Sequence, residues 1–166
     1  TQCPVVYMPI GTIEWHGPHN PVGLDTLKAH ALCVRIAKAG GGLVFPPLYF
    51  GENRENALLE AVPGLGSRIA AYMGLPEDSF EPGYMGHSRQ EQDDMYARLL
   101  QHMLHQASSL GFRVAAFCAG HYPLIDHAKA ACHIFHQQTL HVAPERRTIS
   151  FVFTGYELVG DLFPYA

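Results

Sequence analysis

Four short runs of apolar residues alternate along the chain with longer segments whose apolar positions repeat every three or four residues. The short runs predict buried strands, and the longer segments predict amphipathic helices. The expected strands span residues 3–10, 42–50, 112–118 and 148–154, with the second cut short by Pro46 and Pro47. The expected helices span residues 25–40, 88–110 and 124–139. Residues 51–88 show weak periodicity and predict an irregular segment with one short helix near 65–73.

Local signals set the ends of two of these helices. Asp25 stands where an N-cap is expected and Gly40 where the first helix should stop. Ser88 and Glu91 have the spacing of a capping box, in which each residue bonds the backbone N–H of the other. These signals predict a helix start at both places.

The alternation of strands and helices predicts an α/β fold with a mostly parallel sheet covered by helices on both faces. The length of 166 residues fits one domain. The loops at 11–24 and 119–123 each follow an expected strand. Because ligand sites of such sheets lie beyond the carboxyl ends of the strands, both loops should open at the same edge.

Composition excludes several classes of function. The net charge of −4 and the scattered Lys and Arg residues argue against a nucleic-acid-binding face. No apolar run reaches the roughly 18 residues of a membrane span, so we expect a cytoplasmic protein without a membrane partner. The four cysteines are far apart and predict free thiols, and the charged fraction of 16% leaves room for a contact between subunits. Eleven histidines favour metal or proton-transfer chemistry.

The candidate chemistry lies in the two loops. Glu14 and His16 are two residues apart, so in extended backbone their side chains point the same way. Asp25 and His121 should reach the same edge from the first helix and the third expected strand. Two carboxylates and two imidazoles suit Zn, Mn or Fe, with a metal-bound water as nucleophile. Taken singly, Asp25 could be only a helix cap and His121 could bond a carbonyl group.

The stretch "VVYMPIGTIEWHGPHNPVGLDT" at residues 5–26 resembles the opening motif of the creatininase family of metal-dependent amidohydrolases. "LVFPPLYFGENREN" and "GFRVAAFCAGHYPL" are similar to two later segments of that family. The resemblance implies a three-layer α/β/α sandwich, a pair of divalent ions, hydrolysis of small amides, and a homo-oligomer such as a hexamer. It also implies that residues 1–166 are a single domain lacking its C-terminal part.

Carried onto this sequence, the resemblance makes Glu14, His16, Asp25 and His121 metal ligands. It implies that Asp25 bridges two ions, one also held by Glu14 and His121, and the other by His16. The chain departs from the pattern at Pro123, where creatininase has a ligating glutamate, and at Asn56, where the family has a histidine. No spacing singles out a substitute ligand among the acidic residues Glu52, Glu55, Glu60 and Glu157.

The main hypothesis is therefore a creatininase-type hydrolase that cleaves a C–N bond of a small polar amide with one or two divalent ions, Zn, Mn or Fe. Glu14 and His121 are the residues to which we assign catalysis. An alternative is a non-catalytic metal-binding subunit with an incomplete second metal site. A third hypothesis, a thiol hydrolase that uses Cys118 with His121, has no nucleophile elbow to support it.

Overall fold

The computed structural model describes residues 3–14, 16–51, 64–81, 84 and 86–155. Contacts divide the chain into two compact units, one of residues 1–51 and 97–166 and the other of residues 52–96. Asn56 and the acidic residues Glu52, Glu55, Glu60 and Glu157 lie outside the described residues.

The first unit is built on four parallel strands in the order β2-β1-β3-β4. Their bounds are Val5–Ile10 for β1, Leu43–Val44 for β2, Val114–Ala119 for β3 and Ile149–Thr154 for β4. β1 and β3 pair over six residues, from Val5 opposite Val114 to Ile10 opposite Ala119. The central strands are largely buried, as their continuous apolar sequences predict.

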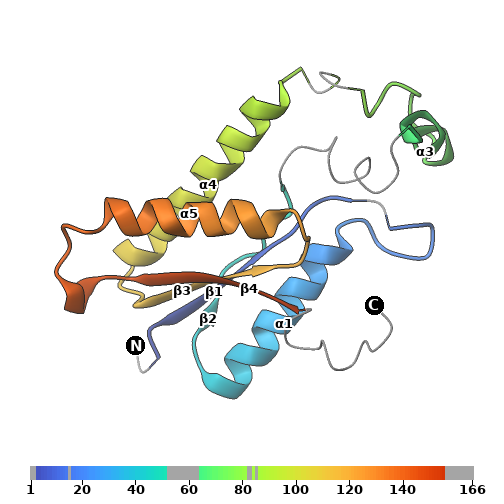
Figure 1. The fold of residues 1–166 in the computed structure, drawn as a ribbon. Helices are drawn as coiled ribbons and strands as arrows, with labels where there is room; N and C mark the ends of the chain where they lie inside the picture. Colours follow the sequence, from blue (N-terminus) through green and yellow to red (C-terminus); the bar gives the residue numbers. More distant parts are fainter. Residues whose placement is uncertain (1–2, 15, 52–63, 82–83, 85, 156–166) are drawn as a thin grey trace. The chain divides into compact units, whose positions relative to one another are not determined.

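Two helices cover opposite faces of this sheet (Figure 1). α1 (Leu24–Gly40) packs on β1, β2 and β3, and α5 (Leu124–Gln138) packs on β3 and β4. The final residues of α4 (Arg89–Ser109) reach α5, where His105 Nε2 lies 2.8 Å from Gln138 Oε1. The predicted α/β fold, with a parallel sheet between layers of helices, is confirmed.

The connections after β1 and β3 leave the sheet in opposite directions. β1 leads through α1 to β2 on one side, and β3 leads through α5 to β4 on the other. In parallel sheets such a point of divergence opens a crevice at the carboxyl ends of the two strands, where ligands bind. The candidate residues follow β1 and β3.

The second unit contains the short helix α3 (Gly66–Tyr72), close to the expected 65–73. The expected capping box is also present, since Ser88 N donates to Glu91 Oε2 at 2.8 Å and Glu91 N to Ser88 Oγ at 3.3 Å. These bonds hold the pKa of the Glu91 carboxyl below its usual value. A short 3₁₀ turn at Pro144–Arg146 precedes β4 in the first unit.

Two sequence expectations need correction. Asp25 is not the N-cap of α1, because the helix begins at Leu24 after Gly23, whose φ of 81° suits glycine. The second strand covers two residues instead of nine, and beyond the prolines Leu48 makes a single bridge to Ile10. Proline lacks the N–H that a continuous ladder requires. Among the described residues, no helix combines the length and apolarity that a bilayer crossing requires.

Candidate metal centre

The structure brings together Glu14, His16, Asp25 and His121, which we call the strand-end cluster. Glu14 and His16 lie in the loop after β1, Asp25 in the first turn of α1, and His121 directly after β3. The side chains of Asp25, His121 and Glu14 are 5%, 8% and 13% exposed, and that of His16 is 29% exposed. Two carboxylates and two imidazoles therefore converge at a site where three of the four side chains are almost buried.

Two glycines allow α1 to approach the ends of the central strands closely. A Cβ at Gly11 would lie 2.6 Å from Thr26 N, and one at Gly120 would lie 2.8 Å from the Asp25 carbonyl carbon. Both distances are shorter than real Cβ contacts allow. Gly11 and Gly120 are thus required for the first turn of α1 to lie against β1 and β3, which places the Asp25 carboxylate beside His121.

The distances within the cluster suit one small cation. Nε2 of His16 lies 3.4 Å from Asp25 Oδ2 and 3.7 Å from Glu14 Oε2, while Nδ1 of His121 lies 3.2 Å and 3.1 Å from the same two oxygens. Ligands held about 2.0–2.2 Å from a tetrahedral ion are separated from one another by about 3.3–3.6 Å. Glu14, His16 and Asp25 form a group whose ligand atoms all lie within 4.8 Å of one another, and His121 is not part of this group.

The orientation of His16 is compatible with a cation at this position. Its Nδ1 lies 3.3 Å from the Glu14 carbonyl oxygen, which can only accept a hydrogen bond. When Nδ1 carries the proton, Nε2 presents a lone pair to two carboxylates. Either a metal ion or a second proton on the ring satisfies this arrangement, and a backbone carbonyl on the other ring nitrogen is the usual partner of a metal-binding histidine. Within the same loop, Asn20 Nδ2 donates to the His16 carbonyl at 2.9 Å.

A fifth residue, Lys28, contacts the cluster from one turn further along α1. Its Nζ lies 2.7 Å from Asp25 Oδ1. Burial alone would raise the pKa of the Asp25 carboxyl, but hydrogen bonds from His121 and Lys28 and the nearby Lys28 charge outweigh it and hold that pKa below 3.8. Lys28 was not expected at the site from the sequence, although its position three residues after Asp25 on a predicted helix was the available signal.

Asp25 contacts both histidines through the same oxygen, Oδ2. The family resemblance implies instead a carboxylate that bridges two ions, which would use both oxygens. His19, the remaining histidine of the opening motif, is exposed. Tyr122 is also exposed, with 69% of its surface accessible, and Pro123 occupies the N-cap of α5.

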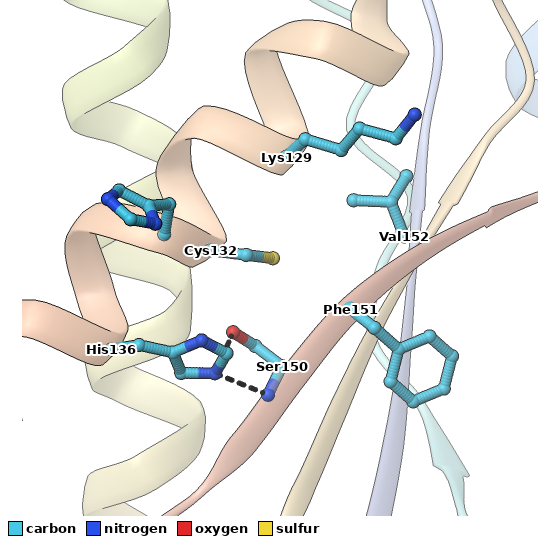
Figure 2. A pocket seen from close by; sticks show the side chains of 7 residues that line it. Lys129, Cys132, His136, Ser150, Phe151 and Val152 are labelled. Carbon is cyan, nitrogen blue, oxygen red and sulfur yellow. Dashed lines mark hydrogen bonds between the residues drawn. The ribbon is translucent and has the colours of Figure 1, made fainter.

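A groove of about 370 Å³ lies elsewhere in the first unit, between α5 and β4, and we call it the α5–β4 groove (Figure 2). It is lined by Lys129, Cys132, His133, His136, Ser150, Phe151 and Val152. His136 Nε2 lies 3.1 Å from Ser150 N and 3.0 Å from Ser150 Oγ, so its lone pair accepts a backbone N–H. Burial raises the pKa of the Cys132 thiol, which keeps it protonated.

Cys118, the nucleophile of the thiol-hydrolase hypothesis, lies in the hydrophobic core. It is 1% exposed and packs with Ala29 and Cys33. Interaction with Cys118 and burial raise the pKa of the Cys33 thiol. The burial of Cys118 leaves a substrate no access to its sulfur, and this geometry argues against thiol chemistry.

Known proteins match this chain in sequence over part of its length and in fold over nearly all of it. A family model described as creatininase, creatinine amidohydrolase, matches residues 1–65. The creatinine amidohydrolase of Pseudomonas putida is 40% identical over 47 residues, which cover 28% of this chain and 18% of that protein. The mycofactocin precursor peptide peptidase of Mycolicibacterium smegmatis is 32% identical over 81 residues, which cover 45% of this chain and 32% of that protein.

Solved creatininase structures share the fold over nearly the whole chain. A manganese form has a TM-score of 0.69 at 19% identity, with 96% of this chain and 53% of that chain covered. A mutant described as a Zn–Zn type has a TM-score of 0.66 at 20% identity, with 99% and 57% covered. The chain thus spans less than two thirds of the length of each of these proteins. By its first 65 residues and by its fold, the resemblance of this chain to the creatininase family is confirmed.

Proposed function

We propose that this protein is a metal-dependent amidohydrolase, which cleaves a C–N bond of a small polar amide or cyclic amide. The observation that carries the proposal is the orientation of His16, whose Nε2 faces the carboxylates of Glu14 and Asp25 at 3.7 and 3.4 Å. The named relatives are hydrolases of creatinine and of a precursor peptide, which supports hydrolysis in general and leaves the substrate open.

Within the proposal, the strand-end cluster holds a divalent cation, Zn, Mn or Fe. A cation bound there supplies a water of lowered pKa as nucleophile and polarises the carbonyl of the substrate. All three metals accept carboxylate and imidazole ligands. The relatives of known structure include manganese and zinc forms.

The residues of the chain supply charge and orientation. Glu14 and Asp25 place two negative charges around the cation, and Glu14 and His121 are the residues to which we assign catalysis. Nδ1 of His121 lies within 3.2 Å of both carboxylates, so its ring is held toward the position of the cation. Because Asp25 and His121 are buried, their electrostatic interactions are screened less than those of surface groups.

We also propose that the protein is a cytoplasmic homo-oligomer, of which a hexamer is one form. A charged fraction of 16% and the apolar side chains Ile149 and Phe151, which are 62% and 46% exposed on β4, support a contact between subunits. Sedimentation analysis of the purified chain measures this state directly.

The test of the proposed activity joins metal content with turnover. The full chain is assayed on a panel of small linear and cyclic amides, creatinine among them, before chelation, after chelation and after Zn²⁺ or Mn²⁺ is restored. We expect turnover to vanish on chelation and to return with the metal. Glu14→Gln should lose both bound metal and turnover, while the control Glu145→Gln, in the exposed 3₁₀ turn, should keep both.

Two outcomes would contradict the proposal in different ways. Turnover that survives both chelation and Glu14→Gln would exclude metal-dependent hydrolysis. Tightly bound metal without turnover on any amide would favour the alternative, a metal-binding subunit without catalytic activity.

A further inference from the structure

The two carboxylate oxygens of Asp25 have different partners. Oδ2 faces the strand-end cluster, 3.4 Å from His16 Nε2 and 3.2 Å from His121 Nδ1. Oδ1 lies 2.7 Å from Lys28 Nζ, the length of a charge-assisted hydrogen bond. Asp25 and Lys28 are three residues apart on α1, which places them on the same face of the helix. Asp25 is therefore shared between the cluster and an ammonium group.

A carboxylate that bridges two metal ions gives one oxygen to each, with the ions about 3.5–4 Å apart. Here the oxygen available for a second ion already has the Lys28 ammonium as its partner. A second divalent ion at that oxygen would meet a positive charge at close range. One divalent ion and one ammonium already supply three positive charges against the two negative charges of Glu14 and Asp25.

Among the described residues, no second group of three or more metal-binding side chains surrounds this oxygen, so a second ion would depend on Asp25 Oδ1 and bound water. Within the part of the chain that the structure describes, the group of Glu14, His16 and Asp25 is the only one with at least three suitably placed metal-binding side chains. Pro123, the second residue after His121, has no side-chain oxygen or nitrogen to offer.

We propose that the Lys28 ammonium takes the place of a second metal ion at Asp25, so that the strand-end cluster holds one divalent ion per chain. This inference rests on the proposed function, because it takes the cluster to be a metal site. Lys28 then acts as a fixed monovalent counter-charge that keeps the outer oxygen of Asp25 oriented. The side chain of Lys28 is 48% exposed, so its replacement leaves no buried cavity and the fold should persist.

The test counts bound ions. Metal-free full chain is titrated with Zn²⁺ by calorimetry, and the bound metal is measured by mass spectrometry after dialysis. We expect one equivalent for the unmodified chain and a second, weaker equivalent for Lys28→Met. Lys28→Arg, which keeps the positive charge, should return to one equivalent. The control Lys38→Met removes the same charge from the exposed end of α1 and should stay at one.

A spectroscopic readout checks the count independently. With Mn²⁺ in place of Zn²⁺, the unmodified chain should give the electron paramagnetic resonance spectrum of an isolated ion. Lys28→Met at excess Mn²⁺ should add the signal of two coupled ions.

The outcomes separate this inference from the proposed function. Two tightly bound ions in the unmodified chain would overturn the role of Lys28 and leave metal-dependent hydrolysis standing. A single equivalent in Lys28→Met would also overturn it, because Lys28 would then not be what excludes the second ion. No bound ion in the unmodified chain would overturn the metal site itself, and this inference with it.

Discussion

The strand-end cluster and the α5–β4 groove contain similar side chains in opposite chemical situations. In the groove, His136 Nε2 accepts the backbone N–H of Ser150 at 3.1 Å (Figure 2). In the cluster, the same ring atom of His16 faces two carboxylates, neither of which donates a proton when ionised. The first imidazole accepts a hydrogen bond from the protein, whereas the second needs a proton or a metal ion between its Nε2 and the carboxylates. The partner of each ring nitrogen therefore separates a structural histidine from a candidate metal ligand.

The largest expected difference between the two sites is in Zn²⁺ affinity when each histidine is replaced separately. His16→Gln should weaken Zn²⁺ binding about 100-fold, because loss of a direct ligand costs at least as much as loss of the groups that orient ligands. His136→Gln should leave the affinity unchanged, since its partner Ser150 lies in β4. Competition with a chromophoric chelator measures both constants. Equal losses in the two variants would show that the partner of the ring nitrogen does not distinguish the sites.

The close approach of α1 to the strand ends can be tested by adding a Cβ atom at a glycine where the backbones meet. Gly120→Ala should lower the free energy of unfolding by about 2 kcal/mol, because the added Cβ would be forced against Asp25. It should also weaken metal binding, since Asp25 carries a ligand. Urea denaturation of metal-free protein measures the first effect. Gly40→Ala is the control: nothing lies within 4 Å of its added Cβ, and its stability should change by no more than about 0.5 kcal/mol.

The smallest effect is expected in the groove. His136→Ala should cost about 1 kcal/mol of unfolding free energy, because the N–H of Ser150 loses its acceptor in a part-buried position. Metal affinity should stay as it is. The exposed neighbour His133 also lines the groove, and His133→Ala should change stability by less than about 0.5 kcal/mol. A larger loss for His133→Ala than for His136→Ala would refute the structural role assigned to His136.

The strands and helices could be predicted where local pattern and tertiary packing agree. α5 was expected at 124–139 and spans Leu124–Gln138, because its apolar spacing matches the face that it buries on the sheet. The capping box at Ser88 and Glu91 formed because both partners are local. β2 fell short of its apolar run because its ladder needs N–H groups that Pro46 and Pro47 lack.

The site was only partly predictable. Alternating strands and helices imply a parallel sheet, in which the loops after β1 and β3 open at the same edge. This is why the sequence could predict that Glu14, His16 and His121 lie close together. The N-cap assignment of Asp25 failed because α1 begins one residue earlier, and the distant His121 and the helix neighbour Lys28 bind the Asp25 carboxylate in place of the backbone. Likewise, no local pattern distinguishes Gly11 and Gly120 from other loop glycines, since their need arises from a helix distant in sequence.

The glycine contacts anchor the two halves of the cluster differently. Asp25 and His121 are anchored to a helix turn and a strand end that press on each other, whereas Glu14 and His16 stand on a connecting loop outside the regular elements. At the proposed metal site, ions of different radius would be accommodated by the loop half, because the other half is fixed by packing. A preference among metals at the proposed site would then be set by the loop, where the sequence can change without disturbing the sheet.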